Sequence, residues 1–339
     1  MELASKTSGT TPAPETELVE SCPLCGAHER TLICAAFDRT RPERVPHFEY
    51  SRCTACGVAF QSVRPPAHKA ALHYADDYEP HAADAPARAE LRGLRRGASG
   101  TAGLVNRIVA NTWRDPWKRR SKKLYTPPRA GATLLDYGCG SARFLDKARK
   151  LGWSTTGVDF VPRVVDAVRS AGHRAFLVAD CWREIADNSL DWVRLNHVVE
   201  HLYDPRAELT RILQHLRPGG RLHMATPNGD ALGLERFGNA WFPLECPRHV
   251  ILYTPDTMKR LLVDCGFVEV EVFQEPVAKD SVRSRAYQLV DRGELAFDAI
   301  AEWVEDPLRE RLDVLPARFA GSRGRADRLQ VLARRPASS

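Results

Sequence analysis

The chain has 339 residues and a net charge of +6, and its 43% hydrophobic and 27% charged residues describe a water-soluble globular protein. A chain of this length can bury one substantial core and a smaller second unit. No stretch approaches the roughly 20 apolar residues of a membrane-spanning helix, which excludes an integral membrane protein of the helical kind. Residues 1–19 are rich in Thr, Pro, Ser and Glu, and they predict a disordered lead-in rather than a signal peptide.

Two cysteine pairs follow in residues 20–65. Each is a C-x-x-C sequence followed by glycine, and 27 residues separate the two pairs, whose members are Cys22, Cys25, Cys53 and Cys56. This spacing lets the two thiolates of one turn reach the same ion, and soft thiolates in fourfold coordination favour zinc. The pattern predicts a small zinc-ribbon-like module with a closed, structural zinc site. The alternative is free or redox-active thiols. The other cysteines are scattered, which suits a cytoplasmic location better than a disulfide framework.

Residues 66–129 are predicted to form a helical, basic linker. Its densest part, residues 113–125, interleaves Lys and Arg with Trp113, Trp117 and Tyr125. Such a segment could meet phosphates or the anionic surface of a membrane as a peripheral contact. The alternative is a solvated helix whose aromatic side chains pack on the main domain. The sequence leaves both interpretations open.

Short apolar runs alternate with helical stretches from residue 130 to residue 339. This alternation predicts an α/β domain with a Rossmann-like, seven-stranded, mostly parallel sheet and helices on both faces. A helical insertion is expected near residues 280–318, as a cover over the site or as a dimer face. The expected strands cover residues 132–138, 154–160, 174–180, 190–198, 221–227, 268–274 and 326–335.

The carboxyl ends of the first three expected strands carry the candidate ligand contacts. The first strand ends in "LLDYGCGSAR", where Gly138 and Gly140 permit a sharp turn and a close approach of a ligand to the backbone. Asp136 stands at the same end. Asp159 ends the second strand, 23 residues later, where an acid can accept hydrogen bonds from both hydroxyls of a ribose. Asp180 ends the third strand, where it can accept from an adenine amino group.

This ordered set of motifs resembles the class I S-adenosylmethionine-dependent methyltransferases. The resemblance rests on "LDYGCGSARFL", "GVDF", "VADCW", "HVVEHLYDP" and "LRPGGRL", and it covers roughly residues 130–275 and the last strand. It implies that the glycine loop meets the methionine moiety, with Asp136 supporting that loop. The implied cofactor contacts are Asp136, Gly138, Gly140, Asp159, Phe160, Asp180, Cys181 and Asn196. Ala142 stands where the family usually has a third glycine.

The front end strengthens the resemblance. A four-cysteine zinc module joined to such a domain is similar to methyltransferases of sugar, cell-envelope and natural-product pathways. In these proteins an aromatic-rich linker lies over the cofactor, and "YADDYEPH" resembles it. The candidate lid residues are Tyr74, Tyr78 and His81; the alternative is a surface loop anchored by the tyrosines.

Methyl transfer to oxygen also requires removal of a proton, and histidines are candidates for that role. His249, in "PRH", is the first candidate for a base or a substrate hydrogen-bond partner, with a structural loop anchor as the alternative, and His197 is the second candidate for the base. His197, Glu200 and His201 would share one helical face and could bind a divalent metal; alternatively, Glu200 and His201 organise the junction by hydrogen bonds. Trp241 and Phe242 are expected to form one wall of the acceptor pocket.

The sequence therefore predicts an S-adenosylmethionine-dependent methyltransferase that acts on a small molecule or sugar, most simply by O-methylation in a natural-product or cell-envelope pathway. One alternative is a methyltransferase acting on RNA or protein, and another is a non-catalytic module that retains the cofactor fold. The chain shows no RNA-binding signature, which argues against nucleic acid as a partner. The methyl acceptor and the oligomeric state stay open.

Overall fold

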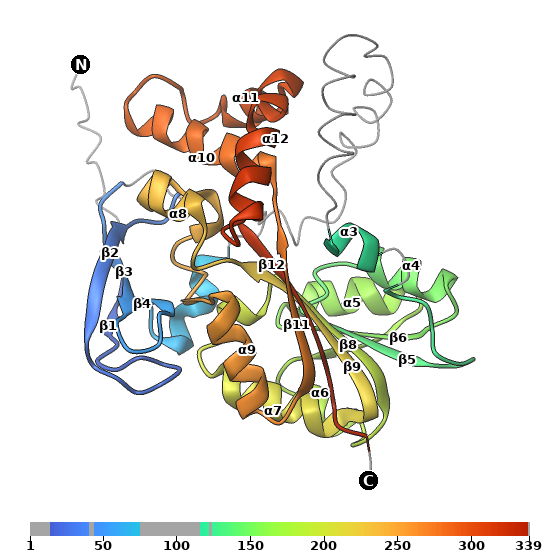
Figure 1. Ribbon diagram of the computed structural model, residues 1–339. Helices are drawn as coiled ribbons and strands as arrows, with labels where there is room; N and C mark the ends of the chain where they lie inside the picture. The colour runs from blue at the N-terminus through green and yellow to red at the C-terminus, as the bar shows by residue number, and fades with distance from the viewer. Residues whose placement is uncertain (1–13, 41–43, 75–115, 122–123, 338–339) are drawn as a thin grey trace, which may run out of the picture.

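Seven strands form the larger of two sheets in the computed structural model, which describes residues 14–40, 44–74, 116–121 and 124–337 (Figure 1). Their order is β11-β12-β9-β8-β5-β6-β7. The strands from β7 to β9 pair in parallel, whereas β12 runs antiparallel to both of its neighbours. The seven predicted strands are thus confirmed. They form a mixed sheet, because the pairs made by β12 are antiparallel. Their bounds are β5 Thr133–Tyr137, β6 Ser154–Asp159, β7 Arg174–Leu177, β8 Leu190–Asn196, β9 Leu216–Pro227, β11 Val268–Glu275 and β12 Arg328–Arg334.

Helices cover both faces of this sheet, as the sequence predicted (Figure 1). Because side chains alternate along a strand, Leu134 and Leu135 of β5 enter different clusters of buried residues. On the Leu134 face pack α3 (Pro116–Ser121), α4 (Arg143–Lys150) and α5 (Pro162–Ser170). On the Leu135 face pack α6 (Cys181–Glu184), α7 (Pro205–His215) and α9 (Pro255–Asp264).

The smaller sheet holds the front of the chain, and it is not an independent unit. Its strands are β1 (Glu17–Leu18), β2 (Arg30–Ala36), β3 (Phe48–Cys53) and β4 (Ala59–Arg64), in the order β1-β4-β3-β2. A fifth strand, β10 (Ile251–Leu252), comes from the main domain and pairs with β4. Phe60 of β4 also belongs to the same buried cluster as Leu135 of β5. A domain boundary at residue 65 therefore does not separate two packing units.

The predicted helical insertion is present as α10 (Ala278–Asp291), α11 (Ile300–Glu305) and α12 (Pro307–Ser322). These helices pack on one another and on the side of the molecule that carries α8 (Leu232–Phe237) (Figure 1). Val282 and Ala286 of α10 and Val304 of α11 form a small buried cluster of their own. The insertion is therefore an added layer over the carboxyl-terminal end of the sheet.

The aromatic residues of the basic linker pack on the main domain where the structure describes them. Trp117 of α3 is buried and stacks on the ring of His223, with ring centroids 5.2 Å apart. The Tyr125 hydroxyl lies 2.6 Å from Nδ1 of the same histidine. This supports the packed-linker interpretation for these two residues; Trp113 lies outside the described residues.

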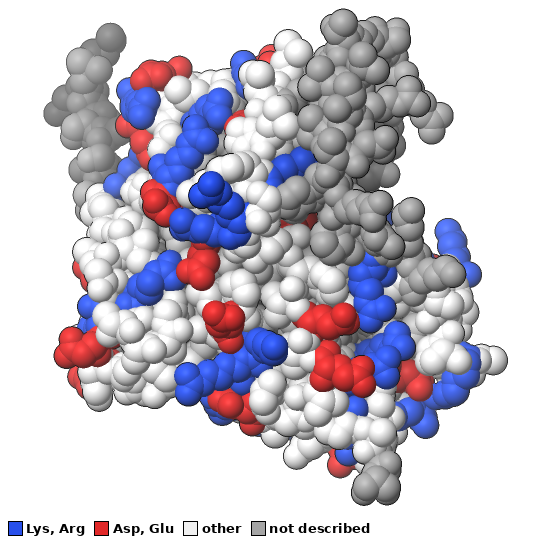
Figure 2. Space-filling model, in the orientation of Figure 1, with Lys and Arg blue, Asp and Glu red and all other residues white. Residues whose placement is uncertain are grey.

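On the face shown in Figure 2, positive and negative side chains of the described residues are interspersed rather than gathered into one basic patch. None of the described helices combines the length and the apolar composition that crossing a membrane would require.

The buried His223 should make stability fall in mild acid. Burial lowers the pKa of His223 to about 4, whereas an unfolded histidine titrates near 6.5. The unfolded chain therefore takes up the proton first, so the contribution is complete above pH 6.5 and is lost as the pH falls towards 4. We expect His223→Gln, which cannot titrate, to lose roughly 2 kcal/mol less stability than the wild type between pH 7 and pH 5 in urea unfolding. Equal losses in the two proteins would contradict this assignment.

Candidate functional site

A cavity of about 880 Å³ opens at the carboxyl ends of β5, β6 and β8. This is within the range of sites that enclose a cofactor or a drug-sized ligand. The strand ends contribute Gly138, Asp159 and Asn196. The opposite walls come from the front sheet, from the helix η1 (Ala67–His73), from residues 239–249 and from α10. The position agrees with the rule that ligands of such sheets bind beyond the carboxyl ends of the strands.

The loop after β5 is held in a fixed shape. Gly138 has a φ of +72°, and a Cβ added there would collide with the Val198 side chain, so only glycine fits. The Gly140 amide donates to Oδ2 of Asp159 at 2.9 Å, and the Val161 amide donates to Oδ1 of the same side chain at 3.0 Å. Asp159 therefore orders both loops at the cavity edge. Its carboxylate has acceptor capacity left for a ligand, because each oxygen can accept more than one hydrogen bond.

Four of the predicted cofactor contacts border the cavity besides Asp159: Gly138, Gly140, Phe160 and Asn196. Phe160 is 44% exposed and meets the Tyr74 ring edge-on, with centroids 5.0 Å apart. Tyr74 also borders the cavity, where its hydroxyl lies 2.9 Å from Nδ1 of His201. One residue of the predicted lid is thus at the site; Tyr78 and His81 lie outside the described residues.

Asp136, one of the predicted cofactor contacts, lies away from the cavity wall. Its side chain does not border the cavity and accepts a hydrogen bond at 2.7 Å from Arg194, which stands opposite it in the β5–β8 register. Burial raises the pKa of Asp136, and the Arg194 charge offsets part of this effect. Asp136 therefore joins two central strands, and it affects the glycine loop only through β5.

The predicted adenine contacts at Asp180 and Cys181 are not found at the cavity either. The chain turns into α6 at this point, so the Asp180 carboxylate accepts from Arg183 of the same helix at 2.7 Å. Cys181 is fully buried, and its thiol donates to the Val178 carbonyl at 3.3 Å. Val178 is the residue of this segment that does border the cavity.

The two catalytic candidates meet around one buried carboxylate. Nδ1–H of His197 donates to Oε1 of Glu200 at 3.1 Å, and Nε2 of His249 lies 3.9 Å from the same oxygen. Burial would raise the pKa of Glu200, but the hydrogen bond from His197 and the nearby histidines hold it at about 2. His197 has a φ of +57°, which non-glycine residues rarely adopt and which is often found at functional sites.

His249 is oriented as a proton acceptor. It is 3% exposed and borders the cavity, and its Nδ1 must carry the proton because it donates to the Pro243 carbonyl at 2.7 Å. Nε2 is unprotonated when the ring is neutral, and it lies 3.3 Å from Oε2 of Glu245. Burial lowers the pKa of His249 to about 4, so the ring is neutral at pH 7. A proton arriving at Nε2 would be stabilised by the Glu245 carboxylate.

The structure brings together a different group of candidate metal ligands from the one that the sequence predicted. Ligand atoms of Glu200, His201 and His249 lie within 4.8 Å of one another, whereas His197 is not part of this group. Nδ1–H of His201 donates to the Arg248 carbonyl at 2.9 Å, which leaves its Nε2 as an acceptor. Oε2 of Glu200 is buried and has no hydrogen-bond partner within the described chain. Two imidazoles and a carboxylate suit a divalent transition metal better than magnesium.

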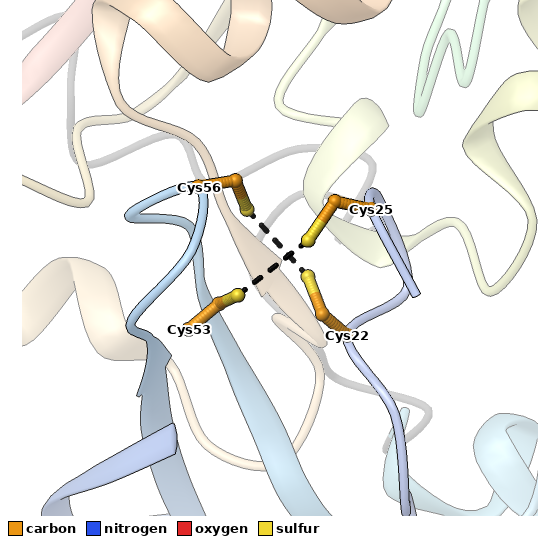
Figure 3. Close-up of side chains that lie close together, drawn as sticks. All are labelled: Cys22, Cys25, Cys53 and Cys56. Atoms are coloured by element: carbon orange, nitrogen blue, oxygen red, sulfur yellow. Dashed lines mark hydrogen bonds between the residues drawn. The ribbon is translucent and has the colours of Figure 1, made fainter. Parts of the chain in front are cut away.

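The four cysteines of the front sheet converge as the spacing predicted. Their sulfur atoms point toward one another from two turns (Figure 3) and lie within 4.8 Å of one another. Sγ of Cys22 is 3.6 Å from that of Cys56, and Sγ of Cys25 is 3.6 Å from that of Cys53. Tetrahedral coordination with zinc–sulfur bonds of about 2.3 Å places sulfur atoms roughly 3.8 Å apart. The cluster therefore fits a tetrahedral ion.

Comparisons with known proteins show what the chain is similar to. Residues 106–272 match the protein family described as a methyltransferase domain. Nearly half of the chain thus resembles a methyltransferase domain. A ubiquinone biosynthesis O-methyltransferase of Chelativorans sp. (strain BNC1) is 27% identical over 179 residues, which is 49% of this chain and 68% of that protein. A malonyl-[acyl-carrier protein] O-methyltransferase of Serratia marcescens is 31% identical over 38% of this chain and 51% of its own length.

The aligned segments span between 44% and 68% of the length of these and other curated relatives. Among solved structures, phosphoethanolamine N-methyltransferase 2 of Haemonchus contortus in complex with S-adenosyl-L-methionine aligns with a TM-score of 0.45 and 18% identity, over 65% of this chain and 53% of that chain.

Sequence reasoning missed much of the cavity wall that lies away from the strand ends. Phe242 and Trp241 were expected and do border it. The additional residues are Phe37, Arg39, Tyr203, Arg248, Arg283, Tyr287 and Arg328. The four-residue spacing of Arg283 and Tyr287 on one helix was a usable signal. No local pattern marks Phe37 or Arg39, because they reach the cavity only through the packing of the front sheet.

Proposed function

We propose that this chain transfers a methyl group from S-adenosylmethionine to an oxygen atom of a small molecule or sugar. The observation that carries the proposal is the glycine loop, which Asp159 holds at the carboxyl ends of β5 and β6, on the edge of a cavity of about 880 Å³. The methyltransferase family match and the O-methyltransferase names of the relatives support the same chemistry.

The residues at the strand ends fit the cofactor. Asp159 would accept hydrogen bonds from the ribose hydroxyls, and Phe160 would pack against the adenosine. The backbone at Gly138 and Gly140 approaches the cavity without a side chain, which suits the methionine moiety. When bound, S-adenosylmethionine supplies a methyl group on a sulfonium, so the protein must mainly align the acceptor and exclude water.

We assign the removal of the acceptor proton to Nε2 of His249. This atom is the unprotonated nitrogen of a neutral ring at the cavity wall, with Glu245 beside it. A second arrangement is favoured by the unpartnered Oε2 of Glu200: a divalent cation held by Glu200, His201 and His249 would orient the hydroxyl and make it more acidic. In both arrangements His249 contributes directly.

The test of the proposed function is a methyl-transfer assay with radiolabelled S-adenosylmethionine, the purified chain and a panel of hydroxylated acceptors, with thiol and amine analogues as controls. We expect label in an O-methylated product. Cofactor binding without transfer to any acceptor would favour the non-catalytic alternative. Label appearing only in added RNA or protein would favour the macromolecular alternative, and a steep salt dependence would identify the RNA case.

We also propose that the four-cysteine cluster binds one structural zinc ion. The sulfur–sulfur distances of 3.6 Å support it, and four protein ligands leave no open position for chemistry. The backbone amides of Gly26 and Gly57 donate to the carbonyls of Cys22 and Cys53, and so they close the two turns beneath the ion. Thiolate ligands require a reducing compartment, so we propose a cytoplasmic location on the same basis.

Zinc analysis should find one tightly bound ion per chain in reducing buffer. Cys53→Ser should lose this ion, whereas Cys34→Ser, which lies outside the cluster, should keep it. Because the front sheet shares β10 and buried residues with the main domain, the loss should also lower the melting temperature of the whole protein. Zinc-free wild-type protein with unchanged stability would refute the proposal.

A further inference from the structure

Four side chains form a continuous surface on the acceptor side of the cavity. We call Arg39, Phe242, Arg283 and Tyr287 the arginine–aromatic wall, and all four border the cavity. Arg283 and Tyr287 lie four residues apart on α10, and therefore on the same side of this helix. Arg39 follows β2 of the front sheet, and Phe242 begins the short helix η4 (Phe242–Leu244).

In the wall, two neighbouring rings each face one guanidinium group. The Arg39 guanidinium lies 4.8 Å from the centroid of the Tyr287 ring, and the Arg283 guanidinium lies 4.6 Å from that of Phe242. The two rings are 6.1 Å apart. The Phe242 amide donates to Oγ of Ser284 at 2.8 Å, which ties η4 to α10. Two rings thus lie between two guanidinium groups in a fixed arrangement.

Arg283 differs from the other arginines at the cavity. Arg39 forms a two-pronged pair with Asp291, Arg328 forms one with Asp280, and Arg248 is paired with Asp38 and Glu245. Among the described residues, the guanidinium of Arg283 faces the Phe242 ring and forms no salt bridge. A guanidinium at the wall of an aromatic cavity has strong, directed hydrogen-bond donors that a carboxylate or phosphate would satisfy.

We propose that the methyl acceptor carries an anionic group, a carboxylate or a phosphate, which Arg283 binds while a ring of the acceptor packs on Phe242 and Tyr287. The inference rests on the proposed function, because it takes this part of the cavity as the acceptor site of a methyltransferase. It specifies the class of substrate: a ring-containing hydroxyl compound with a negative charge.

The test uses the full chain saturated with S-adenosylhomocysteine and calorimetric titration of matched probes. 3,4-Dihydroxybenzoate and the neutral 3,4-dihydroxybenzamide form the carboxylate arm, and phenyl phosphate and phenol form the phosphate arm. We expect the anionic member of at least one arm to bind about tenfold or more tightly than its neutral partner, and the arm that does so identifies the group. Arg283→Gln should abolish this preference and Arg283→Lys should restore part of it. Arg292→Gln, an exposed arginine at the end of the same helix, should keep it.

Failure of this inference can be told apart from failure of the proposed function. If the wild type binds S-adenosylhomocysteine but prefers neither anion, the anionic acceptor is overturned and the methyltransferase proposal stands. If the preference survives in Arg283→Gln, Arg283 is not the group that binds the anion, and the inference is overturned in the same way. If the wild type does not bind S-adenosylhomocysteine, the proposed function fails and the inference fails with it.

Discussion

His249→Ala is expected to lower kcat by about 10²–10⁴-fold and to leave the Kd for S-adenosylhomocysteine unchanged. The imidazole lies at the cavity wall with its unprotonated nitrogen beside Glu245, whereas the predicted cofactor contacts come from the ends of β5, β6 and β8. The substitution removes both the proton acceptor and a possible cation ligand. Single-turnover assays give the rate of the chemical step, and calorimetry gives the cofactor affinity.

His197→Ala serves as the matched comparison, because His197 also hydrogen-bonds to Glu200 but does not share the group of converging ligand atoms. A normal rate in His249→Ala together with a large loss in His197→Ala would move the base to the end of β8. Normal rates in both variants would mean that alignment alone drives the reaction. The cation arrangement would be favoured if chelation abolished the activity of the purified enzyme and a divalent metal restored it. The four-cysteine zinc would have to stay bound throughout this experiment.

Asp159→Ala is expected to weaken binding of S-adenosylhomocysteine by at least tenfold, or about 1.4 kcal/mol or more. The carboxylate is 1% exposed and holds the Gly140 and Val161 amides, so its loss frees the loop as well as removing a ribose partner. Asp159→Asn should give a smaller loss, because the amide oxygen can still accept from one of these donors. Calorimetric titration of each variant measures the effect.

Asp180→Ala is the control for this prediction. Asp180 is an acid at the end of the next strand segment, but it pairs with Arg183 and does not border the cavity. Its replacement should change the affinity little. Equal losses in Asp159→Ala and Asp180→Ala would show that the adenine contact predicted from the sequence exists in the bound state, and an unchanged affinity in Asp159→Ala would refute the ribose assignment.

The strands, helices and glycine loop could be predicted because their signals are local. Alternation of apolar runs with helical stretches placed each strand of the large sheet, and two glycines after β5 located the ligand loop. The direction of a side chain at a strand end depends on neighbouring elements, and the local sequence does not show it. Asp136 turns to Arg194 because the two are opposite in the β5–β8 register, and Asp180 turns to Arg183 because α6 begins directly after it.

The packing of the front module on the main domain could not be predicted for a similar reason. β10 has only two residues and lies far from β4 in the sequence, so no sequence pattern predicts that these strands pair. That pairing joins the four-cysteine sheet to the main domain and brings Arg39 to the cavity opposite α10. The four cysteines themselves were predictable, because their spacing alone decides which atoms can reach one ion.

The most direct test of the central claim is a calorimetric titration of the wild-type chain with S-adenosylhomocysteine near pH 7. A cofactor site formed by the glycine loop and Asp159 predicts one site per chain with a Kd in the micromolar range, and competition by S-adenosylmethionine. No saturable binding at ligand concentrations up to about 1 mM would contradict the account.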